Sequence, residues 1–371
     1  MRLLVAPQEF KGSLTAAEAA AAIAEGIRDV HPSWELDLLP MSDGGPGFVD
    51  AFEASLGGER HIVPAHDALL RPLNASILSI PSASGPLVVV EAAAANGLVL
   101  IDPAARDALA ADTFGVGELL AAAFDLLPAT LVIGVGGSAT TDGGHGMARA
   151  LGAQFLDDAG RPLLPGGASL AGLAAVHWQR PPVLERVDVV VAVDVTNPLV
   201  GPRGAAAIYG PQKGATAAHV DALDAALTRY AAVVRRQLGV EVATLPGGGA
   251  AGGLAAGLVA FLGARLESGF DIVSRVSGLE ERFHAADTVV TGEGSFDAQS
   301  GEGKTTGRLL AMAKSAEKPA VVFAGVAPAG SVAVTLHTLE PDPAKSMANA
   351  AGLLRDLARR WASGSNGTSA V

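Results

Sequence analysis

The feature that most constrains the fold of this 371-residue chain is a pattern that recurs along it: a short apolar run that ends in a glycine-rich turn carrying an acidic residue. Uninterrupted apolar runs are typical of strands buried on both faces of a parallel sheet. Helix-like segments follow several of the turns, and this alternation predicts an α/β fold. The four turns are Asp43-Gly44-Gly45, Gly134 to Ser138 leading into Asp142, Asp194 with Thr196 and Asn197, and Gly292-Glu293-Gly294.

The two ends of the chain are predicted to share one sheet. A strand over 2–6, a helix over 15–30 and a strand over 35–39 open the chain as a βαβ unit, and Thr15 with Glu18 has the spacing of a capping box. From residue 64 to 90, short strand-like pieces separated by Pro, Asn and Ser indicate antiparallel structure and a change of domain. Further strands are expected over 131–135, 187–193, 288–290 and 320–324, and a long helix over 216–238.

We therefore expect a doubly wound parallel-sheet domain made of residues 1–65 and 280–371, with a second α/β domain, residues 66–279, inserted in it. Ligands of open parallel sheets bind beyond the carboxyl ends of the strands. The active site is accordingly expected in the cleft between the two domains.

Composition excludes several classes of protein. The formal net charge is −12 without any run of Lys and Arg, so nucleic acid and anionic membranes are not expected partners. There are no cysteines, which excludes disulfides, thiolate metal sites and a cysteine nucleophile. The uncharged stretch 242–264 opens with Pro246 and three glycines, and its remainder is short for a membrane span. With no signal-peptide pattern at the amino terminus, we expect a cytoplasmic protein.

The glycine-rich turns point to phosphate chemistry. Glycine lets backbone N–H groups approach phosphate oxygens closely, and acids beside phosphates bind Mg²⁺ or orient a nucleophile. The alternative is that each Asp caps a helix and each Gly makes an ordinary turn. For one turn the two interpretations are equally good, but four such turns favour a shared site for phosphoryl transfer.

Three basic residues lie in similar turns. Lys11 follows the first strand in Phe10-Lys11-Gly12-Ser13, where a lysine can reach a phosphate. Arg203 and Lys213 lie in Gly/Pro turns after Asp194 and could neutralise a carboxylate or a phosphate. The alternative for all three is solvated loop charge.

Two generic nucleotide motifs are weak. Gly134-x-Gly136-x-x-Ala139 lacks the acid that a dinucleotide-binding fingerprint places at the end of the next strand. The run from Ala298 to Gly303-Lys304-Thr305 approximates a P-loop but does not directly follow its strand.

Taken together, these segments resemble the bacterial type I glycerate kinase family over nearly the whole chain. The most specific strings are Phe10-Lys11-Gly12-Ser13, Ser42-Asp43-Gly44-Gly45, Asn197-Pro198-Leu199, Gly210 to Ala215 and Thr291 to Gly294. The resemblance implies ATP-dependent phosphorylation of D-glycerate at the 2-hydroxyl with Mg²⁺, on a Rossmann-like domain with an inserted second domain. The chain departs from the family pattern at Gln8-Glu9 in place of Asp-Ser, Pro46 in place of Glu, Thr141 in place of Asn, and Ser295 in place of Arg.

Roles for the site residues are expected as follows. Asp194 would orient or deprotonate the acceptor hydroxyl, and Lys11 would act beside it by holding phosphate. Substrate-binding residues would be Asp43, Gly44, Gly45, Asn197, Arg203 and Lys213. Nucleotide-binding residues would be Ser13, Gly136, Gly137, Ser138, Gly292, Glu293 and Gly294. Asp142 is the expected metal ligand, with Asp43 and Glu293 as alternatives.

Two other functions stay open at this point. A dinucleotide-dependent oxidoreductase would need tight NAD(P) binding and a ribose-binding acid, and a non-catalytic sugar-acid sensor would bind glycerate without turning over ATP. A monomer and a homodimer are both compatible with the sequence.

Overall fold

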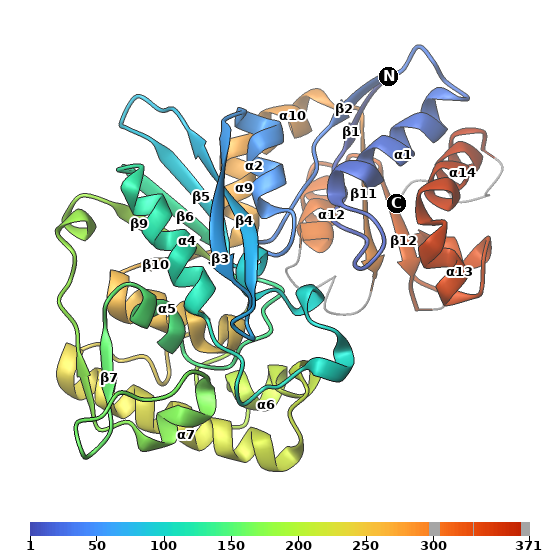
Figure 1. Ribbon diagram of the computed structural model, residues 1–371. Helices are drawn as coiled ribbons and strands as arrows, with labels where there is room; N and C mark the ends of the chain where they lie inside the picture. Colours follow the sequence, from blue (N-terminus) through green and yellow to red (C-terminus); the bar gives the residue numbers. More distant parts are fainter. Residues whose placement is uncertain (297–304, 329, 365–371) are drawn as a thin grey trace. The chain divides into compact units, whose positions relative to one another are not determined.

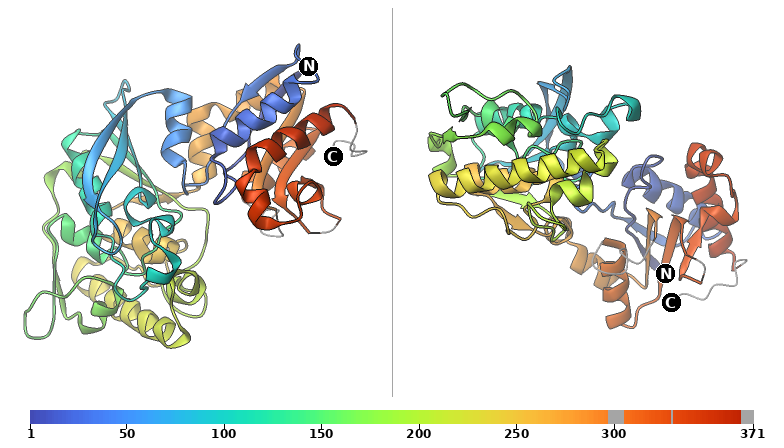
Figure 2. Two further views of the ribbon diagram at one scale, coloured as in Figure 1. Left: turned by 45° about the vertical axis from the view of Figure 1, so that its right-hand side comes forward. Right: turned by 90° about the horizontal axis from the view of Figure 1, so that it is seen from below.

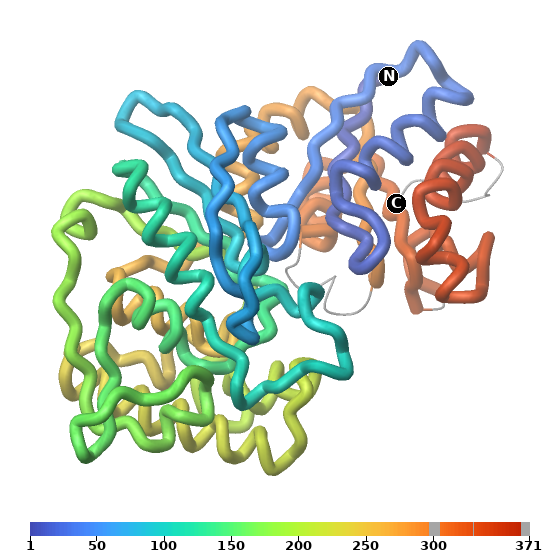
Figure 3. Tube along the Cα trace, viewed as in Figure 1, coloured from blue at the N-terminus to red at the C-terminus, as the bar shows by residue number. Residues whose placement is uncertain are grey.

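The computed structural model describes residues 1–296, 305–328 and 330–364. The chain forms two compact α/β units (Figure 1). Unit 1 consists of Met1–Asp43, Asp50–Leu56 and Phe270–Val371, and unit 2 of Gly44–Val49 and Gly57–Gly269. Figure 3 shows the blue and red ends of the chain within the same unit.

Unit 1 contains a five-stranded sheet in the order β13-β12-β11-β1-β2. Every neighbouring pair in it is parallel. The strands are β1 (Arg2–Val5), β2 (Glu35–Leu38), β11 (Thr288–Ser295), β12 (Ala320–Val326) and β13 (Ala333–Thr335). The expectation that strands from both ends of the chain share one sheet is confirmed, and so is the α/β fold class with a parallel, doubly wound arrangement.

Helices cover both faces of this sheet. Helices α1 (Ala16–Arg28) and α14 (Ala350–Ala362) pack against each other over one face (Figure 2), where Leu3 and Phe323 belong to the same apolar cluster. Leu4 and Val322 point to the opposite face and are also buried. On that side, α10 (Leu279–Ala285) contacts β1 and α12 (Thr305–Ser315) contacts β11 and β12.

Helix α1 forms where its sequence predicts. Thr15 caps its amino terminus through a hydrogen bond from the N–H of Glu18, whose carboxylate accepts from Thr15 N–H, so the capping box is confirmed. Gly26 allows α14 to approach, because a Cβ atom at this position would lie 2.1 Å from the carbonyl oxygen of Arg355.

Unit 2 contains a six-stranded mixed sheet in the order β10-β9-β6-β5-β4-β3. Antiparallel strands β3 (Glu59–His66), β4 (Pro72–Ile80) and β5 (Leu87–Glu91) confirm the antiparallel segment expected from 64 to 90. Parallel strands β6 (Thr130–Gly134), β9 (Asp188–Ala192) and β10 (Arg265–Glu267) continue from β5. A separate two-stranded sheet pairs β7 (Gln154–Leu156) with β8 (Ala175–His177).

The longest helix of unit 2 is α7 (Ala217–Leu238), as expected; it is the long yellow helix in Figure 2. The uncharged stretch near residue 250 forms short helical pieces, among them α8 (Leu254–Gly257), that are largely buried. None of the helices in the described residues is both long and apolar enough to cross a membrane. The remaining α-helices are α2 (Phe48–Leu56), α3 (Ala93–Asn96), α4 (Phe114–Asp125), α5 (His145–Ala150), α6 (Ala205–Tyr209), α9 (Gly269–Ser277) and α13 (Pro343–Ala348).

The two units divide at different residues from the expected domains. Strand β3 lies across the expected boundary at 65, but it pairs with β4 and so belongs to unit 2. Helix α9 belongs to unit 1, which therefore begins again at Phe270 rather than at 280. That the two parts act as separate domains with the active site between them stays a prediction.

The contact at Gly26 predicts the effect of adding one methyl group there. We expect Gly26→Ala to destabilise the protein by about 1–3 kcal/mol, because the methyl would separate α1 from α14. Gly352→Ala in α14 is the matched control: Gly352 is exposed, and a methyl there meets only the side chain of Asn349. Urea unfolding of the two variants tests this, and equal stability would contradict it.

Candidate functional site

The strand order of the unit 1 sheet reverses at β1. From β1 the strand order runs outward in both directions, to β2 on one side and to β11 and β12 on the other. Such a reversal is where open α/β sheets bind ligands. After β1 the chain continues beside β11, since Ala6 N–H donates to Val290 O (2.7 Å) and Gln8 N–H to Gly292 O (2.8 Å).

A tight turn over 10–14 follows β1 at the carboxyl edge of the sheet. Phe10 N–H donates to Leu14 O and the Ser13 hydroxyl to Phe10 O, both at 2.8 Å, and Gly12 has a left-handed φ of 79°. The Lys11 side chain at the tip is exposed.

Two glycines let neighbouring backbones meet behind this turn. A Cβ at Gly294 would lie 2.9 Å from Lys11 N, and a Cβ at Gly325 would lie 2.4 Å from Gly294 O. The structure thus brings together Lys11, Ser13 and Gly294 from the expected set. Gly325 was missed, because it ends the apolar run of β12 without an acid beside it.

A cavity of about 250 Å³ opens beside the turn. It is bounded by the turn, by the ends of β11 and β12, and by the segment that contains α13. The residues that line it are Phe10, Lys11, Ser13, Gly294, Gly325, Val326, Leu336, His337, Glu340, Pro341, Pro343, Ser346, Met347 and Ala350.

Two carboxylates adjoin Lys11 at the same edge. Beyond β1 and β2 the two segments stay paired, with Leu39 N–H donating to Val5 O (2.8 Å) and Met41 N–H to Pro7 O (2.9 Å). Glu9 and Asp43 follow on these paired segments. Burial raises the pKa of the Glu9 carboxyl, and the charge of Asp43 raises it further, while Lys11 opposes the shift.

In unit 2, two of the expected glycine turns pack against each other, and one of them touches the end of β9. Gly136 N–H donates to Gly44 O (2.9 Å), and a Cβ at Gly136 would lie 2.5 Å from Gly45 Cα. A Cβ at Gly44 would lie 2.8 Å from Ala192 Cβ. Gly44, Gly45 and Gly136 therefore form one continuous backbone surface at the carboxyl edge, with Gly137 exposed beside it.

Asp194 lies at this edge, two residues beyond β9, and is half-buried. Its Oδ1 accepts a hydrogen bond of 2.7 Å from the hydroxyl of Ser268, which follows β10. Ser268 was not identified from the sequence, because β10 is only three residues long and has no apolar run that would predict a strand there.

The turn after Asp194 is fixed by the side chain of Asn197. Its Nδ2 donates to Arg203 O (2.9 Å), and its Oδ1 accepts from the Tyr209 hydroxyl (2.8 Å). The Arg203 side chain is exposed. Asn197 thus shapes the turn that presents Arg203.

Asp142 lies beneath the glycine turn and is fully buried. Its Oδ2 accepts from Thr113 N–H (2.9 Å), the Thr113 hydroxyl (2.8 Å) and Gly146 N–H (3.0 Å), and its Oδ1 accepts from Gly144 N–H (3.1 Å). A carboxylate with this many internal donors is stabilised as an anion inside the protein. Within the described ranges, no three His, Asp or Glu side chains are grouped so that they could hold a metal ion.

Lys213 is buried beside Asp142, with 2% of its surface exposed. Its ammonium donates to Thr140 O (2.5 Å), and the Thr140 hydroxyl in turn lies 2.9 Å from that of Ser138, which is also buried. Burial lowers the pKa of Lys213 to about 7, and the charge of Asp142 partly opposes this shift. The structure therefore brings Asp142, Lys213 and Ser138 together beneath the turn, not at the exposed surface of its glycines.

The remaining expected residues belong to β11. Gly292 packs on β12, since a Cβ there would lie 2.5 Å from Phe323 O, and Glu293 is buried next to it. In the P-loop-like run, Ala298, Gly303 and Lys304 lie outside the described residues.

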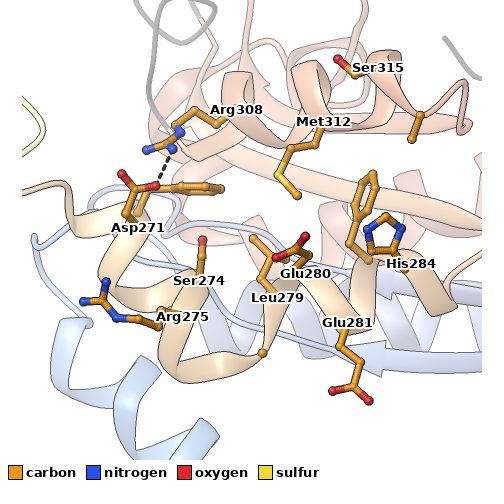
Figure 4. Close-up of a pocket in the computed structure, with 14 residues that line it drawn as sticks. Asp271, Ser274, Arg275, Leu279, Glu280, Glu281, His284, Arg308, Met312 and Ser315 are labelled. Atoms are coloured by element: carbon orange, nitrogen blue, oxygen red, sulfur yellow. Dashed lines mark hydrogen bonds and ion pairs between the residues drawn. The ribbon is translucent and has the colours of Figure 1, made fainter.

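A second and larger cavity, about 960 Å³, lies between α12 and the pair α9 and α10 (Figure 4). Met312 enters it from α12 and Ser274 from α9, and Arg308 pairs with Asp271 at 2.5 Å on one side. None of the expected site residues lines it.

Parallel strands that end in glycine turns, with acids and exposed cations beside them, define an α/β enzyme suited to transferring phosphate. A model of the glycerate kinase family matches residues 3–363. The chain is 42% identical to a glycerate kinase from Halalkalibacterium halodurans over 91% of this chain and 89% of that protein, and 43% identical to the glycerate 2-kinase of Escherichia coli over 88% and 85%. It resembles the crystal structure of a Salmonella typhimurium LT2 protein assigned as glycerate kinase 2, with a TM-score of 0.79, 38% identity, and coverage of 98% of this chain and 97% of that one. The chain belongs to the glycerate kinase family.

The buried lysine predicts a pH dependence of stability. Between about pH 7 and 10.5 the unfolded chain binds a proton at Lys213 that the folded chain does not, so the contribution of this residue to the free energy of unfolding rises with pH. We expect Lys213→Met to remove that rise. Urea unfolding across this range measures it, with Arg203→Met, which removes an exposed cation of the same unit, as the control. A wild-type slope in Lys213→Met would contradict the burial of a neutral lysine.

Proposed function

We propose that this chain transfers the γ-phosphate of ATP to the 2-hydroxyl of D-glycerate, giving 2-phosphoglycerate. The observation that carries the proposal is the convergence of Gly44, Gly45 and Gly136 on the strand end that presents Asp194. The Escherichia coli relative, named a glycerate 2-kinase, supports the choice of hydroxyl.

Asp194 is suited to orient the acceptor hydroxyl. Its carboxylate is half-buried, and the bond from Ser268 limits its rotation. Transition states of phosphoryl transfer are loose, so a positioned carboxylate contributes mainly by orienting the hydroxyl and by accepting its proton late.

Arg203 is suited to bind the carboxylate of glycerate. Its guanidinium is exposed, and Asn197 fixes its backbone. A planar guanidinium can donate two parallel hydrogen bonds to a carboxylate. Lys213, which was expected in the same role, would act on the substrate through Thr140 and the glycine turn above it.

The turn over 10–14 is suited to hold the phosphates of ATP. Lys11 and Gly12 are exposed in this turn. A glycine-rich turn lets backbone N–H groups approach phosphate oxygens closely. We assign Ser13, Gly292, Glu293 and Gly294 to this part of the site, and Gly136, Gly137 and Ser138 to the turn beside the acceptor.

Mg²⁺ fits the carboxylates of this chain, since it prefers oxygen ligands and often takes one or two carboxylates together with substrate phosphates. Asp43 and Glu9, paired at the edge beside Lys11, supply such a donor set. The ion would neutralise phosphate charge. Asp142 as the ligand stays a prediction, against which its four internal hydrogen bonds weigh.

The other two functions are less well supported. Gly136 packs on the 44–45 turn, where a dinucleotide-binding loop would leave its glycine open to the pyrophosphate. A sensor without turnover is not supported by relatives that are named as kinases.

The role of Asp194 predicts a large loss of turnover in Asp194→Asn. We expect kcat to fall by about 10²–10⁴-fold with folding retained, because the variant keeps the shape but loses the proton acceptor. Asp188→Asn, at the opposite end of β9, is the control and should keep kcat. Glycerate-dependent ADP release gives the rate, and phosphorus NMR identifies the product. A folded Asp194→Asn variant within about tenfold of wild type would defeat the assignment.

The two candidate metal ligands make opposite predictions. Asp43→Asn should raise the Mg²⁺ concentration for half-maximal activity by about tenfold or more and leave stability unchanged, because one oxygen donor to the ion is lost. Asp142→Asn should instead lower the free energy of unfolding, because internal N–H donors lose their charged acceptor. Mg²⁺ titrations of activity and urea unfolding of both variants separate the roles. If Asp142→Asn instead raised the Mg²⁺ requirement and Asp43→Asn did not, Asp142 would be the metal ligand.

A further inference from the structure

We infer that the 250 Å³ cavity beside Lys11 binds the nucleobase of ATP, with Ser346 and Met347 of α13 as base-binding residues. The inference rests on the proposed function for the use of ATP. It adds a location and a recognition chemistry for the base.

The cavity is continuous with the proposed phosphate site. Lys11, Ser13 and Gly294 line one of its sides, and they are the residues assigned to phosphate. A nucleotide whose phosphates lie at Lys11 can therefore place its base against α13 without leaving the cavity.

The size fits a base and not a whole nucleotide. Pockets for drug-sized ligands measure about 300–1,000 Å³. At about 250 Å³ the cavity lies just below that range, as expected for a subsite from which the phosphate chain emerges.

The cavity offers apolar surface to a flat ring. Val326 and Met347 are each 49% exposed, which makes them two of the most exposed large apolar side chains of unit 1, and both line it. Leu336 and Ala350 form its buried side. Met347 also reaches the phosphate turn, since its Cε lies 3.0 Å from the position that a Cβ of Gly12 would occupy. A ring between Val326 and Met347 would remove apolar surface from water.

Ser346 of α13 is one of the polar residues that line the cavity and that a base can contact. Ser346 lines the cavity and is 9% exposed. Its hydroxyl can donate to and accept from the edge of a purine, which carries donors and acceptors.

The larger cavity next to α12 suits a base less well. Its lining includes the ionisable side chains of Asp271, Arg275, Glu280, Glu281, His284 and Arg308, and no residue of the phosphate turn. It serves as the internal control, because both cavities belong to unit 1 and both are lined by a helical serine.

The test compares Ser346→Leu with Ser315→Leu. Ser346→Leu fills the small cavity and removes the hydroxyl of Ser346, whereas Ser315→Leu makes the same change at the larger cavity (Figure 4). Calorimetric titration with ATP measures affinity for the whole nucleotide. Competition by inorganic tripolyphosphate measures affinity for the phosphates alone.

We expect Ser346→Leu to weaken ATP binding by about 10- to 100-fold while tripolyphosphate binding stays within about twofold, and Ser315→Leu to change neither. Equal weakening of ATP and tripolyphosphate, unchanged ATP binding in Ser346→Leu, or weakening by Ser315→Leu would each overturn the inference. If Ser346→Leu does not fold, Met347→Ala, at an exposed position, replaces it with the same expectation. The assay measures binding and requires no turnover. A result that overturns the base-binding inference is therefore distinguishable from a result that overturns the proposed kinase activity.

Discussion

The structure of the candidate site depends on how closely backbone segments approach one another at the carboxyl ends of the strands. Gly44 and Gly136 share a hydrogen bond, and neither position has room for a Cβ atom. Gly294 and Gly325 impose the same condition in unit 1. At each of these glycines, two chain segments pack backbone to backbone. The peptide groups themselves therefore form the surface of the candidate site.

In unit 2, a layer of buried polar residues lies beneath these packed backbone segments. Asp142 collects N–H and hydroxyl donors from two segments, and Lys213 donates to the carbonyl of Thr140 in the same turn. A charge inside a protein is tolerated when hydrogen bonds and an opposite charge accompany it. The layer therefore connects the glycine turn to α4 and α5, while Asp194 is half-buried and Arg203 is exposed.

Much of this could be predicted from sequence, where local patterns decide the outcome. The capping box of α1 and the apolar run of β9 are short-range signals, and the structure confirms both. Asp43, Asp142 and Asp194 do follow strands, as their positions after apolar runs predict. The prediction was wrong for Gly292, Glu293 and Gly294, which lie inside β11 rather than in a turn after it, because hydrogen bonding to β12 extends the strand past its apolar run. What could not be predicted depends on partners far away in the chain. From sequence alone, Lys213 is indistinguishable from an exposed loop lysine, because its neighbours Asp142 and Thr140 are far away in the chain. Ser268 follows a strand that is too short to be recognised from sequence.

The backbone packing at Gly44 and Gly136 also limits how relatives of this protein can diverge. Any side chain at these positions would push the two turns apart. These glycines therefore cannot be replaced without disrupting the packing of the candidate site. In the turn that ends in Arg203, by contrast, the side chains of Pro202 and Arg203 are exposed. Substitution of these two exposed side chains would leave the backbone packing at Gly44 and Gly136 in place.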